Sequence, residues 1–486
     1  HNVSALAGHE NYKFQTSQLS ATKTGFSYPG QTALDNAAVV EAPPSSSEDN
    51  QRIESYFGSV NYNFNKTYFL QGSVRTDGSS RFAPTTRWGS FYSASLGWVA
   101  TNETFLKNVK WLDFLKLRAS YGESGNDNIG LFYQYANYYY ADGVGNFSTP
   151  SRLANPNLKW ESNADLNVAV EFTILKKLTG TVELYDRRSK DLLFLVPLPP
   201  ALGYSGGTYQ NIGQSKNSGI EVTLGYAPVR TKNFDWKIDF NITSFKNVLT
   251  KLPPTQQITG IVTGNKKYTE GKSIYDFWLR EFAGVDPSTG LSLYYQDVLG
   301  TDGKATGVRN LTTDGAKASF YYVGGSSIPK FNGGLTNSFR YKNFDLSILL
   351  TYAYGGKYYD GNYGGLMSIG SAGTAWSTDI LKRWQKPGDV TNVPRVQTAS
   401  GQDYASSRFL IDASYISIKN INLGFDLPKN VAKKLFISNL RVFGSVDNAY
   451  IFTAKNGGDP QQDFGGNPGS GYPPYRTVTF GVNVKL

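Results

Sequence analysis

The chain ends in V-T-F-G-V-N-V-K-L, residues 478–486, in which apolar and polar side chains alternate. Val478 and Phe480 fall on one face, and Thr479 and Asn483 fall on the other. A period of two residues is that of a β-strand with one apolar and one polar face. In a soluble sandwich the apolar face packs on a second sheet, whereas in an outer-membrane barrel it meets lipid and the polar face lines the lumen. This stretch alone leaves both interpretations open.

The same alternation recurs along the chain. It is found in the segments 56–64, 68–75, 166–174, 236–243 and 344–352. Counting segments of this kind predicts about 14 strands, many of them near the length of about ten residues that a tilted membrane strand needs.

The connections between these strands alternate between short and long. The short ones are 65–66, 175–178, 228–233 and 341–343, while 101–111 and 428–438 are somewhat longer and have room for a helical turn. The long ones are rich in Gly, Ser, Asn and Tyr: 11–50, 78–87, 123–157, 196–215, 250–327, 357–412 and 454–474. This alternation requires one further hairpin, at about 272–296, inside the longest loop.

Short turns on one side and long loops on the other are typical of a transmembrane barrel. A sandwich mixes loop lengths at both ends, and a propeller shows a blade repeat, which we do not find. We therefore predict an all-β fold, a transmembrane antiparallel β-barrel to which this chain contributes about 14 strands. The last strand is expected to close the barrel, so that no edge is left unpaired.

The composition argues against several other classes of protein. Cysteine is absent and the two histidines are His1 and His9, which excludes thiolate chemistry and nearly excludes a histidine metal site. The net charge is +10, but the basic residues are scattered, so we expect no nucleic-acid partner. No apolar run approaches the roughly 18 residues that a membrane-spanning helix needs. There is also no initiating methionine or signal peptide, so the chain reads as a mature or truncated piece.

Several motifs resemble one family in the expected order. They are R-T-D-G-S-S-R-F at 75–82, L-R-A-S-Y-G-E-S-G-N at 117–126, N-P-N-L-K-W-E at 155–161, N-I-G-Q-S-K-N-S-G-I-E at 211–221 and A-S-Y-I-S-I-K-N-I-N-L-G-F-D-L-P at 413–428. Together with the terminal strand they resemble the SusC/RagA-like TonB-dependent outer-membrane transporters over essentially the whole chain. One departure is Leu486, where that family usually ends in an aromatic residue.

The resemblance implies a barrel of 22 strands with an N-terminal plug domain. Residues 1–486 are then the C-terminal part of the barrel, and the plug and first strands are not in this sequence. An open sheet would leave two unpaired edges in lipid, so the remainder is expected upstream of His1 or in a second chain.

The resemblance also implies a function. It is TonB-dependent active import of an oligosaccharide or peptide across the outer membrane of a Gram-negative, Bacteroidota-type bacterium. The implied partners are a SusD-like surface lipoprotein, the TonB-ExbB-ExbD complex acting through the missing N-terminal part, and outer-membrane lipid. The alternative is a passive outer-membrane channel or an adhesin barrel, which the missing plug leaves open.

The sequence contains no complete enzyme motif. E-G-K-S at 270–273 ends like a phosphate-binding loop, but Lys266 occupies the position of its first glycine. Carboxylate pairs such as Glu281 and Asp286 read as solvated loop acids. We predict no enzyme, no catalytic residue, no cofactor and no metal.

The polar face and the loops supply the candidate site residues. Arg75, Arg118, Glu171, Glu183 and Glu221 are expected to contact the plug rather than cargo. In R-T-D-G-S-S-R-F, Asp77 and Gly78 suit the start of a tight turn, and Arg81 is expected to pair with a carboxylate under the loop.

Aromatic faces beside Asp, Asn and Arg suit sugar rings or peptide backbones, although tyrosine and tryptophan also form interface girdles. The possible contacts with cargo or with the lid protein are Tyr133, Tyr135, Tyr138, Trp278, Trp376, Asp379, Arg383 and Trp384.

Overall fold

The computed structural model describes residues 1–30, 32–129, 138–141, 147–196, 198–202, 207–368, 373, 375–397, 404–454, 459–461, 464–467 and 473–485. Contacts divide the chain into two units. The first contains His1–Trp98, Ala119–Leu166 and Arg187–Gln214, and the second contains Val99–Arg118, Asn167–Asp186 and Ser215–Leu486.

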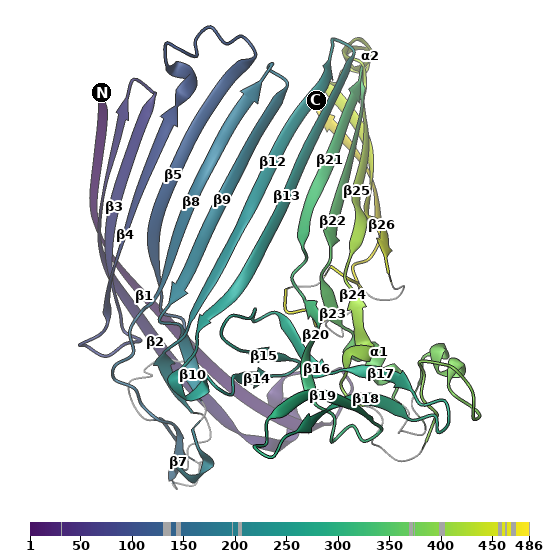
Figure 1. Ribbon diagram of the computed structural model, residues 1–486. Helices are drawn as coiled ribbons and strands as arrows, with labels where there is room; N and C mark the ends of the chain where they lie inside the picture. Colours follow the sequence, from purple (N-terminus) through teal and green to yellow (C-terminus); the bar gives the residue numbers. More distant parts are fainter. Residues whose placement is uncertain are drawn as a thin grey trace. The chain divides into compact units, whose positions relative to one another are not determined.

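The dominant element is a 14-stranded sheet whose strands follow one another in sequence order, which confirms the predicted class and strand number (Figure 1). Its strands are β1 (Asn2–Phe26), β2 (Ala37–Phe64), β3 (Tyr68–Ser79), β4 (Trp88–Val99), β5 (Leu112–Asn126), β8 (Glu161–Ile174), β9 (Leu178–Lys190), β12 (Gln214–Arg230), β13 (Phe234–Lys251), β21 (Phe331–Tyr341), β22 (Phe344–Tyr354), β25 (Tyr415–Asp426), β26 (Asn439–Thr453) and β27 (Thr477–Lys485). Within the described residues β27 pairs only with β26, so β1 and β27 are the two ends of the sheet.

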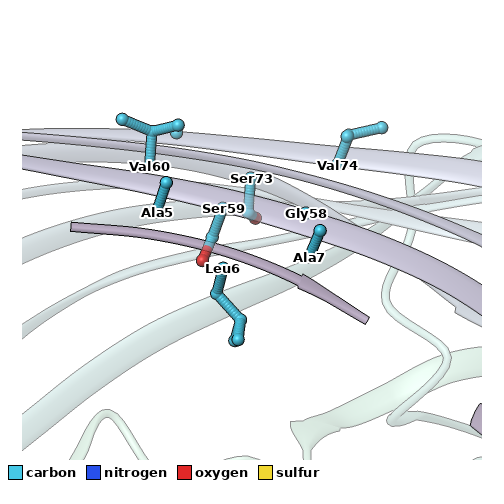
Figure 2. A pocket seen from close by; sticks show the side chains of 9 residues that line it. Ala5, Leu6, Ala7, Gly58, Ser59, Val60, Ser73 and Val74 are labelled. Atoms are coloured by element: carbon cyan, nitrogen blue, oxygen red, sulfur yellow. The ribbon is translucent and has the colours of Figure 1, made fainter. Parts of the chain in front are cut away.

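The predicted two-faced pattern is present in the first unit. Val60, Val74 and Leu96 lie on one face and are each more than half exposed. Ser73 lies on the other face, where its hydroxyl is 2.7 Å from that of Ser93. A hollow of about 590 Å³ is lined by residues of these strands and of β1. Figure 2 shows that Val60 and Val74 point to the opposite side from Leu6 and Ser59. The polar side chains of the hollow are only the two serines that line it, which is too few to orient a ligand.

The interpretation of 11–50 as a loop is wrong. β1 and β2 pair from Asn2 with Asn63 to Phe26 with Ala37, with bulges near Thr22. β3 pairs with β2 only up to Ile53, so the outer part of the ribbon extends past β3. This part is rich in Ser, Thr, Asn and Gln and exposed on both faces, so it has no apolar period. Backbone hydrogen bonds alone define it, and sequence patterning does not report these.

The tight turn predicted at Asp77 and Gly78 is also wrong. Both residues lie in β3, where Gly78 stands opposite Trp88 of β4. A Cβ on Gly78 would lie 3.0 Å from the indole atoms of Trp88, so the glycine makes room for the ring that crosses it. The chain turns after the strand instead, where the amide of Ser79 donates to the carbonyl of Arg87 at 3.1 Å.

The short turns are as predicted. Asn65 and Lys66 in the first unit, and Leu175 and Lys176 in the second, all have φ between 52° and 55°. Two consecutive residues with positive φ are the mark of a type I′ hairpin turn, whose twist matches that of the flanking strands. The two longer connections hold the predicted helical turns, η2 (Ala100–Asn102) and α2 (Lys429–Lys434).

The long loops contain small folded elements. In the second unit these lie at the opposite end of the strands from α2 (Figure 1). One sheet orders β14 (Ile261–Thr263), β15 (Lys266–Tyr268), β16 (Asp276–Arg280) and β20 (Phe320–Ser326), and another orders β17 (Phe282–Val285), β18 (Ser292–Leu299) and β19 (Ala305–Thr312). The loop thus holds more than the single hairpin predicted at 272–296.

Further short elements complete the loops. In the second unit they are η4 (Pro254–Gln256), β23 (Lys357–Tyr359), α1 (Gly361–Leu366), η5 (Thr378–Lys382), η6 (Ser407–Phe409) and β24 (Leu410–Asp412). In the first unit they are η1 (Leu34–Asn36), β6 (Tyr138–Ala141), β7 (Phe147–Arg152), β10 (Leu193–Val196), η3 (Pro200–Leu202) and β11 (Thr208–Asn211). No helix in the described ranges is both long and apolar enough to cross a membrane.

The exposed apolar face of the second unit generates a prediction. Leu224 shares its face of β12 with Ile220 and Tyr226, which are 39% and 42% exposed, whereas the neighbouring Thr223 lies on the opposite face. If the apolar face meets lipid, Leu224→Lys near the midplane lowers the free energy of unfolding by about 2 to 4 kcal/mol and Thr223→Lys by much less. Denaturation of the folded protein in lipid vesicles measures both, and equal losses would contradict the assignment of faces.

Candidate functional site

Most of the charged residues that were expected to contact the plug pair with one another or with neighbouring carboxylates. In the second unit, the guanidinium of Arg118 lies 2.9 Å from Glu171 and also pairs with Glu183. In the first unit, Arg75 bridges Asp77 at 2.7 Å and Glu10 at 2.8 Å. The exposures of these side chains range from 12% to 52%. Arg118 on β5 reaches both β8 and β9, whereas Arg75 pairs within β3 and with β1. Each of these four carboxylates therefore has a cation partner, while Glu221 makes no ion pair among the described residues.

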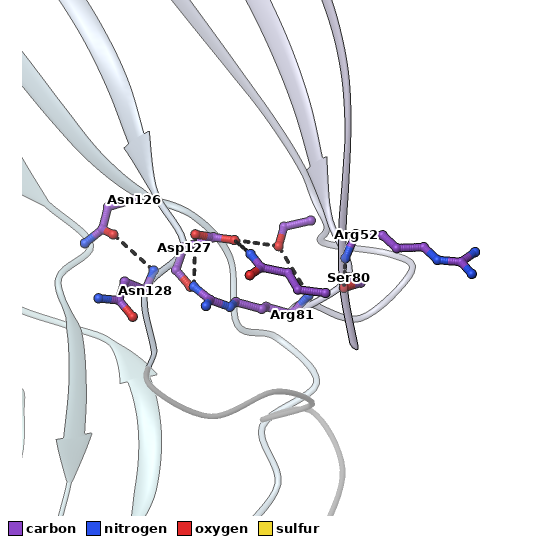
Figure 3. A network of polar contacts seen from close by, with 8 residues as sticks. Arg52, Ser80, Arg81, Asn126, Asp127 and Asn128 are labelled. Carbon is purple, nitrogen blue, oxygen red and sulfur yellow. Dashed lines mark hydrogen bonds and ion pairs between the residues drawn. The ribbon is translucent and has the colours of Figure 1, made fainter. Parts of the chain in front are cut away.

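The predicted carboxylate partner of Arg81 is Asp127, at the base of the loop that follows β5. Figure 3 shows Arg81 donating to both the carbonyl and a carboxylate oxygen of Asp127, at 3.1 and 3.2 Å. The second carboxylate oxygen accepts from Ser79 at 2.7 Å and from Gln51 at 3.2 Å. The prediction is confirmed, and the network joins β2, β3 and the segment after β5.

A small apolar core lies beside this network. Phe82, Ile129 and Leu158 are almost completely buried and pack with Trp160. The indole N–H of Trp160 donates to the carbonyl of Arg87 at 2.7 Å. The motif N-P-N-L-K-W therefore contributes Leu158 and Trp160 to this core. In the first unit it packs the segment before β8 against the segments that follow β3 and β5.

Trp278 is packed within the loop sheet. It stands opposite Tyr322, with their ring centroids 4.9 Å apart and edge to face. The Nζ of Lys267 lies 4.3 Å from the centre of its ring, and Phe320 is stacked at 6.4 Å. Because these neighbours surround a half-buried ring, Trp278 contributes mainly to the packing of β16 on β20.

Asp379 also has partners from its own loop. Its carboxylate accepts from the hydroxyl of Tyr363 at 2.8 Å and from Lys382 at 2.7 Å. Burial, together with the hydrogen bond to Asp379, raises the pKa of Tyr363 to about 12. Tyr363 packs on a buried core formed by Met367, Ile380, Val393 and Phe409. Asp379 thus anchors η5 to that core.

The three remaining candidates of this loop differ in exposure. Trp384 donates its indole N–H to the carbonyl of Pro287 at 2.9 Å and crosses Gly290, where a Cβ would collide with its ring. Trp376 is 36% exposed, and among the described residues it makes no ring contact. Arg383 is half-buried at the end of η5. Trp376 is therefore the candidate with the most accessible ring.

The side-chain contacts of the three candidate tyrosines in the loop after β5 are not described. Tyr133 and Tyr135 lie outside the described residues. Tyr138 begins β6, where only the backbone is described. Their contact with cargo or lid stays a prediction.

Sequence reasoning missed a buried lysine in the second unit. Lys266 in β15 is 7% exposed, and its Nζ donates to the carbonyl of Tyr275 at 2.6 Å and to the hydroxyl of Ser327 at 3.2 Å. The Nζ also lies 3.4 Å from the centre of the Phe277 ring. Ser327 in turn donates to the carbonyl of Phe464. A lysine in a polar loop carries no sequence signal for burial, because lysine is rarely buried at all.

Comparison with known proteins identifies the class. The family described as "TonB dependent receptor-like, beta-barrel" matches residues 3–449. The chain therefore belongs to the TonB-dependent receptor-like β-barrel family, whose barrels lie in the outer membrane, and it is not an enzyme.

Individual relatives support this assignment. The chain is 29% identical to the TonB-dependent receptor P3 of Formosa agariphila, covering 100% of this chain and 51% of that protein. It is 30% identical to the TonB-dependent receptor SusC of Bacteroides thetaiotaomicron, covering 89% and 44%. A solved structure of the RagAB peptide transporter has the same fold, with a TM-score of 0.87 at 25% identity over 100% of this chain and 53% of that one. The chain spans about half the length of the curated relatives it matches.

The Arg81 network predicts a local contribution to stability. The side chains of Arg81 and Asp127 are each 15% exposed, so Arg81→Met leaves a nearly buried carboxylate without its cation. We expect a loss of about 1 to 3 kcal/mol in the free energy of unfolding. Lys159→Met is the control, because Lys159 and its partner Asp191 are 55% and 41% exposed, and a surface ion pair of this kind contributes less than about 1 kcal/mol. Equal losses in urea denaturation would show that the network has no special role.

Lys266 predicts a dependence on pH. Burial, partly opposed by the charge of Asp276, lowers the pKa of Lys266 from 10.5 to about 8. Between these values the unfolded chain holds a proton that the folded protein has released, so the contribution of Lys266 to stability rises as pH increases from about 8 to about 10.5. The melting temperature of the wild type minus that of Lys266→Met should therefore increase across this range. A constant difference would mean that the lysine is not held in a desolvated site.

Proposed function

We propose that this chain is the C-terminal barrel portion of a TonB-dependent importer in the outer membrane of a Bacteroidota-type bacterium. A plug domain and the first strands are supplied by sequence outside residues 1–486. A SusD-like surface lipoprotein caps the loops, and the TonB-ExbB-ExbD complex drives import of an oligosaccharide or peptide.

One observation carries the proposal. A sheet of 14 strands carries exposed apolar side chains on one face and polar, ion-paired side chains on the other, in a chain that belongs to the TonB-dependent receptor-like family over most of its length. A polar face of this kind suits a barrel interior that is filled by protein and water.

The loops of the second unit support a binding role at the end of the sheet opposite to the short turns. They fold on their own buried cores and therefore hold fixed positions for the side chains they expose. Trp376 is such a side chain, and an exposed indole suits the face of a sugar ring or a peptide plane. Binding groups on loops above a rigid scaffold are a common arrangement.

Energy coupling separates this function from a passive channel or an adhesin. Accumulation of labelled cargo by intact cells should stop when the proton gradient is dissipated or TonB is deleted. Uptake that persists under both conditions would favour the passive channel, and attachment without uptake would favour the adhesin.

The two loop tryptophans predict different outcomes. Trp376→Ala removes an exposed ring, so we expect weaker uptake or weaker co-purification of the lid lipoprotein with an unchanged melting temperature. Trp384→Phe removes the hydrogen bond to Pro287, so we expect a loss of about 0.5 to 1.5 kcal/mol in stability with less effect on uptake. Unchanged uptake and unchanged lid binding in Trp376→Ala would remove that residue from the site.

A further inference from the structure

The short connections of the second unit are strongly basic. These five connections, 101–111, 175–178, 228–233, 341–343 and 428–438, hold nine lysines and Arg230 but a single acidic residue, Glu103. The two longest loops of the same unit, 250–327 and 357–412, hold 14 basic and 12 acidic residues together. The excess of positive charge therefore lies in the short turns and not in the long loops.

Backbone hydrogen bonds join the five short connections into one continuous edge, which we call the turn rim. At each step the donor lies within a connection or at most two residues before it, and the acceptor is a carbonyl of the preceding connection. The four bonds, 2.8 to 2.9 Å long, run from Leu175 to Trp111, from Ala227 to Lys177, from Lys342 to Asn233 and from Asp426 to Asn343. The order of the strands thus gathers basic residues that are scattered along the sequence.

The lysines of the turn rim are accessible to a ligand. All nine are exposed, and none makes an ion pair within the described part of the chain: Lys107, Lys110, Lys176, Lys177, Lys232, Lys342, Lys429, Lys433 and Lys434. Arg230, by contrast, lies 3.6 Å from Asp235. Because like charges along one edge repel one another, the turn rim suits an anionic partner.

Aromatic side chains accompany these lysines on the apolar face. Tyr341, Phe344 and Phe425 form one row of the ladder, in which the rings of Phe344 and Phe425 lie 4.6 Å apart. Tyr341 and Phe344 are more than half exposed, and the Nζ of Lys342 lies 5.4 Å from the centre of the Tyr341 ring. The turn rim is therefore continuous with the surface that is expected to meet lipid.

The connection that contains α2 shows the same combination (Figure 1). Leu435 and Phe436 are 57% and 93% exposed, and they directly follow Lys433 and Lys434. Large exposed apolar side chains mark contact surfaces, and their pairing with lysine is typical of the boundary between membrane and water.

We propose that the turn rim binds anionic phospholipids. Its lysines hold the phosphate groups of the headgroups, and the neighbouring rings lie among the first carbons of the acyl chains. The ammonium group of lysine is a compact cation that suits a phosphate, and basic residues beside an apolar membrane surface attract anionic lipid. A soluble acidic protein would neutralise the lysines but would leave the aromatic row of Tyr341 and Phe344 without a role.

The proposal goes beyond import and takes from the proposed function only that the apolar face lies in a membrane. Lipid binding is measured in vesicles without TonB or cargo, whereas import is measured in energised cells. If anionic lipid is not selected while energy-dependent uptake persists, the lipid site falls and the importer stands. If anionic lipid is selected but uptake needs no energy, the reverse holds.

The experiment reconstitutes the full-length protein in phosphatidylcholine vesicles. These contain a small fraction of photoactivatable phosphatidylglycerol or, in a parallel sample, photoactivatable phosphatidylcholine, with a diazirine near the headgroup end of the acyl chain in both. Mass spectrometry of the cross-linked peptides gives the ratio of the two lipids at each end of the strands. We expect the ratio to favour phosphatidylglycerol at the turn rim over the loop end, and to fall toward one in about 1 M salt, which screens charges beyond about 3 Å.

Paired variants test the lysines themselves. The double variant Lys433→Gln with Lys434→Gln removes two charges and no ion pair within the described residues. Each lysine near an anionic surface strengthens the attraction about fivefold, so the ratio at α2 should fall by about 5- to 25-fold. Lys251→Gln with Lys386→Gln is the matched control, because it removes two exposed lysines from the other end of the strands. It should leave the ratio at α2 unchanged.

Heat-modifiable migration confirms that each variant is folded. The proposal is overturned if the two lipids cross-link equally at the turn rim, or if the ratio is the same at both ends of the strands. It is also overturned if folded Lys433→Gln with Lys434→Gln keeps the ratio of the wild type, or if the control variant lowers it by the same factor. Equal cross-linking of the two lipids, together with reduced uptake by the Lys433 and Lys434 variant, would assign these lysines to a soluble acidic partner instead.

Discussion

The hydrogen-bond ladder of the 14-stranded sheet is the constraint on which the rest of this structure depends. Within hydrocarbon there is no water to satisfy a backbone N–H or C=O, so each must find its partner on the neighbouring strand. The alternation of side chains follows from this, because a paired strand necessarily presents one face to lipid and one to the interior. The type I′ turns at Asn65 and Leu175 also follow from the ladder, because their twist continues that of the strands.

Outside the ladder the loops need a different source of order. They obtain it from small buried cores, such as Phe82 with Ile129 and Leu158 in the first unit, and Met367 with Phe409 in the second. Two of the aromatic residues that were expected to bind cargo or the lid belong to this packing. Trp278 lies against Tyr322, and Trp384 lies against the turn at Gly290. A loop built in this way keeps a few side chains in fixed, exposed positions, which is what recognition requires.

The charged residues of the polar face also find partners within the sheet. Arg118 pairs with two glutamates on other strands, and Arg75 pairs with Glu10 and with Asp77 of its own strand. A protein that contacts these residues therefore meets charges that are already paired. Its displacement would leave none of them isolated, which suits an interior that has to open. This matters for the proposed importer, because contact with the plug was the role expected of these residues from sequence.

The sequence by itself determined the class of this protein. The alternation of apolar and polar residues, together with the alternation of short and long connections, defined the strands. A strand with one face toward lipid shows this alternation in its sequence. It also defined the partner of Arg81 as a carboxylate, although not which one. Sequence could not find the ribbon within 11–50 or the strand position of Gly78, because backbone pairing and a neighbouring indole decide these. Nor could it find the burial of Lys266, which arises only where segments distant in the chain pack together. Local patterning reports which face a residue takes on its own strand, and only the tertiary structure decides what lies opposite it.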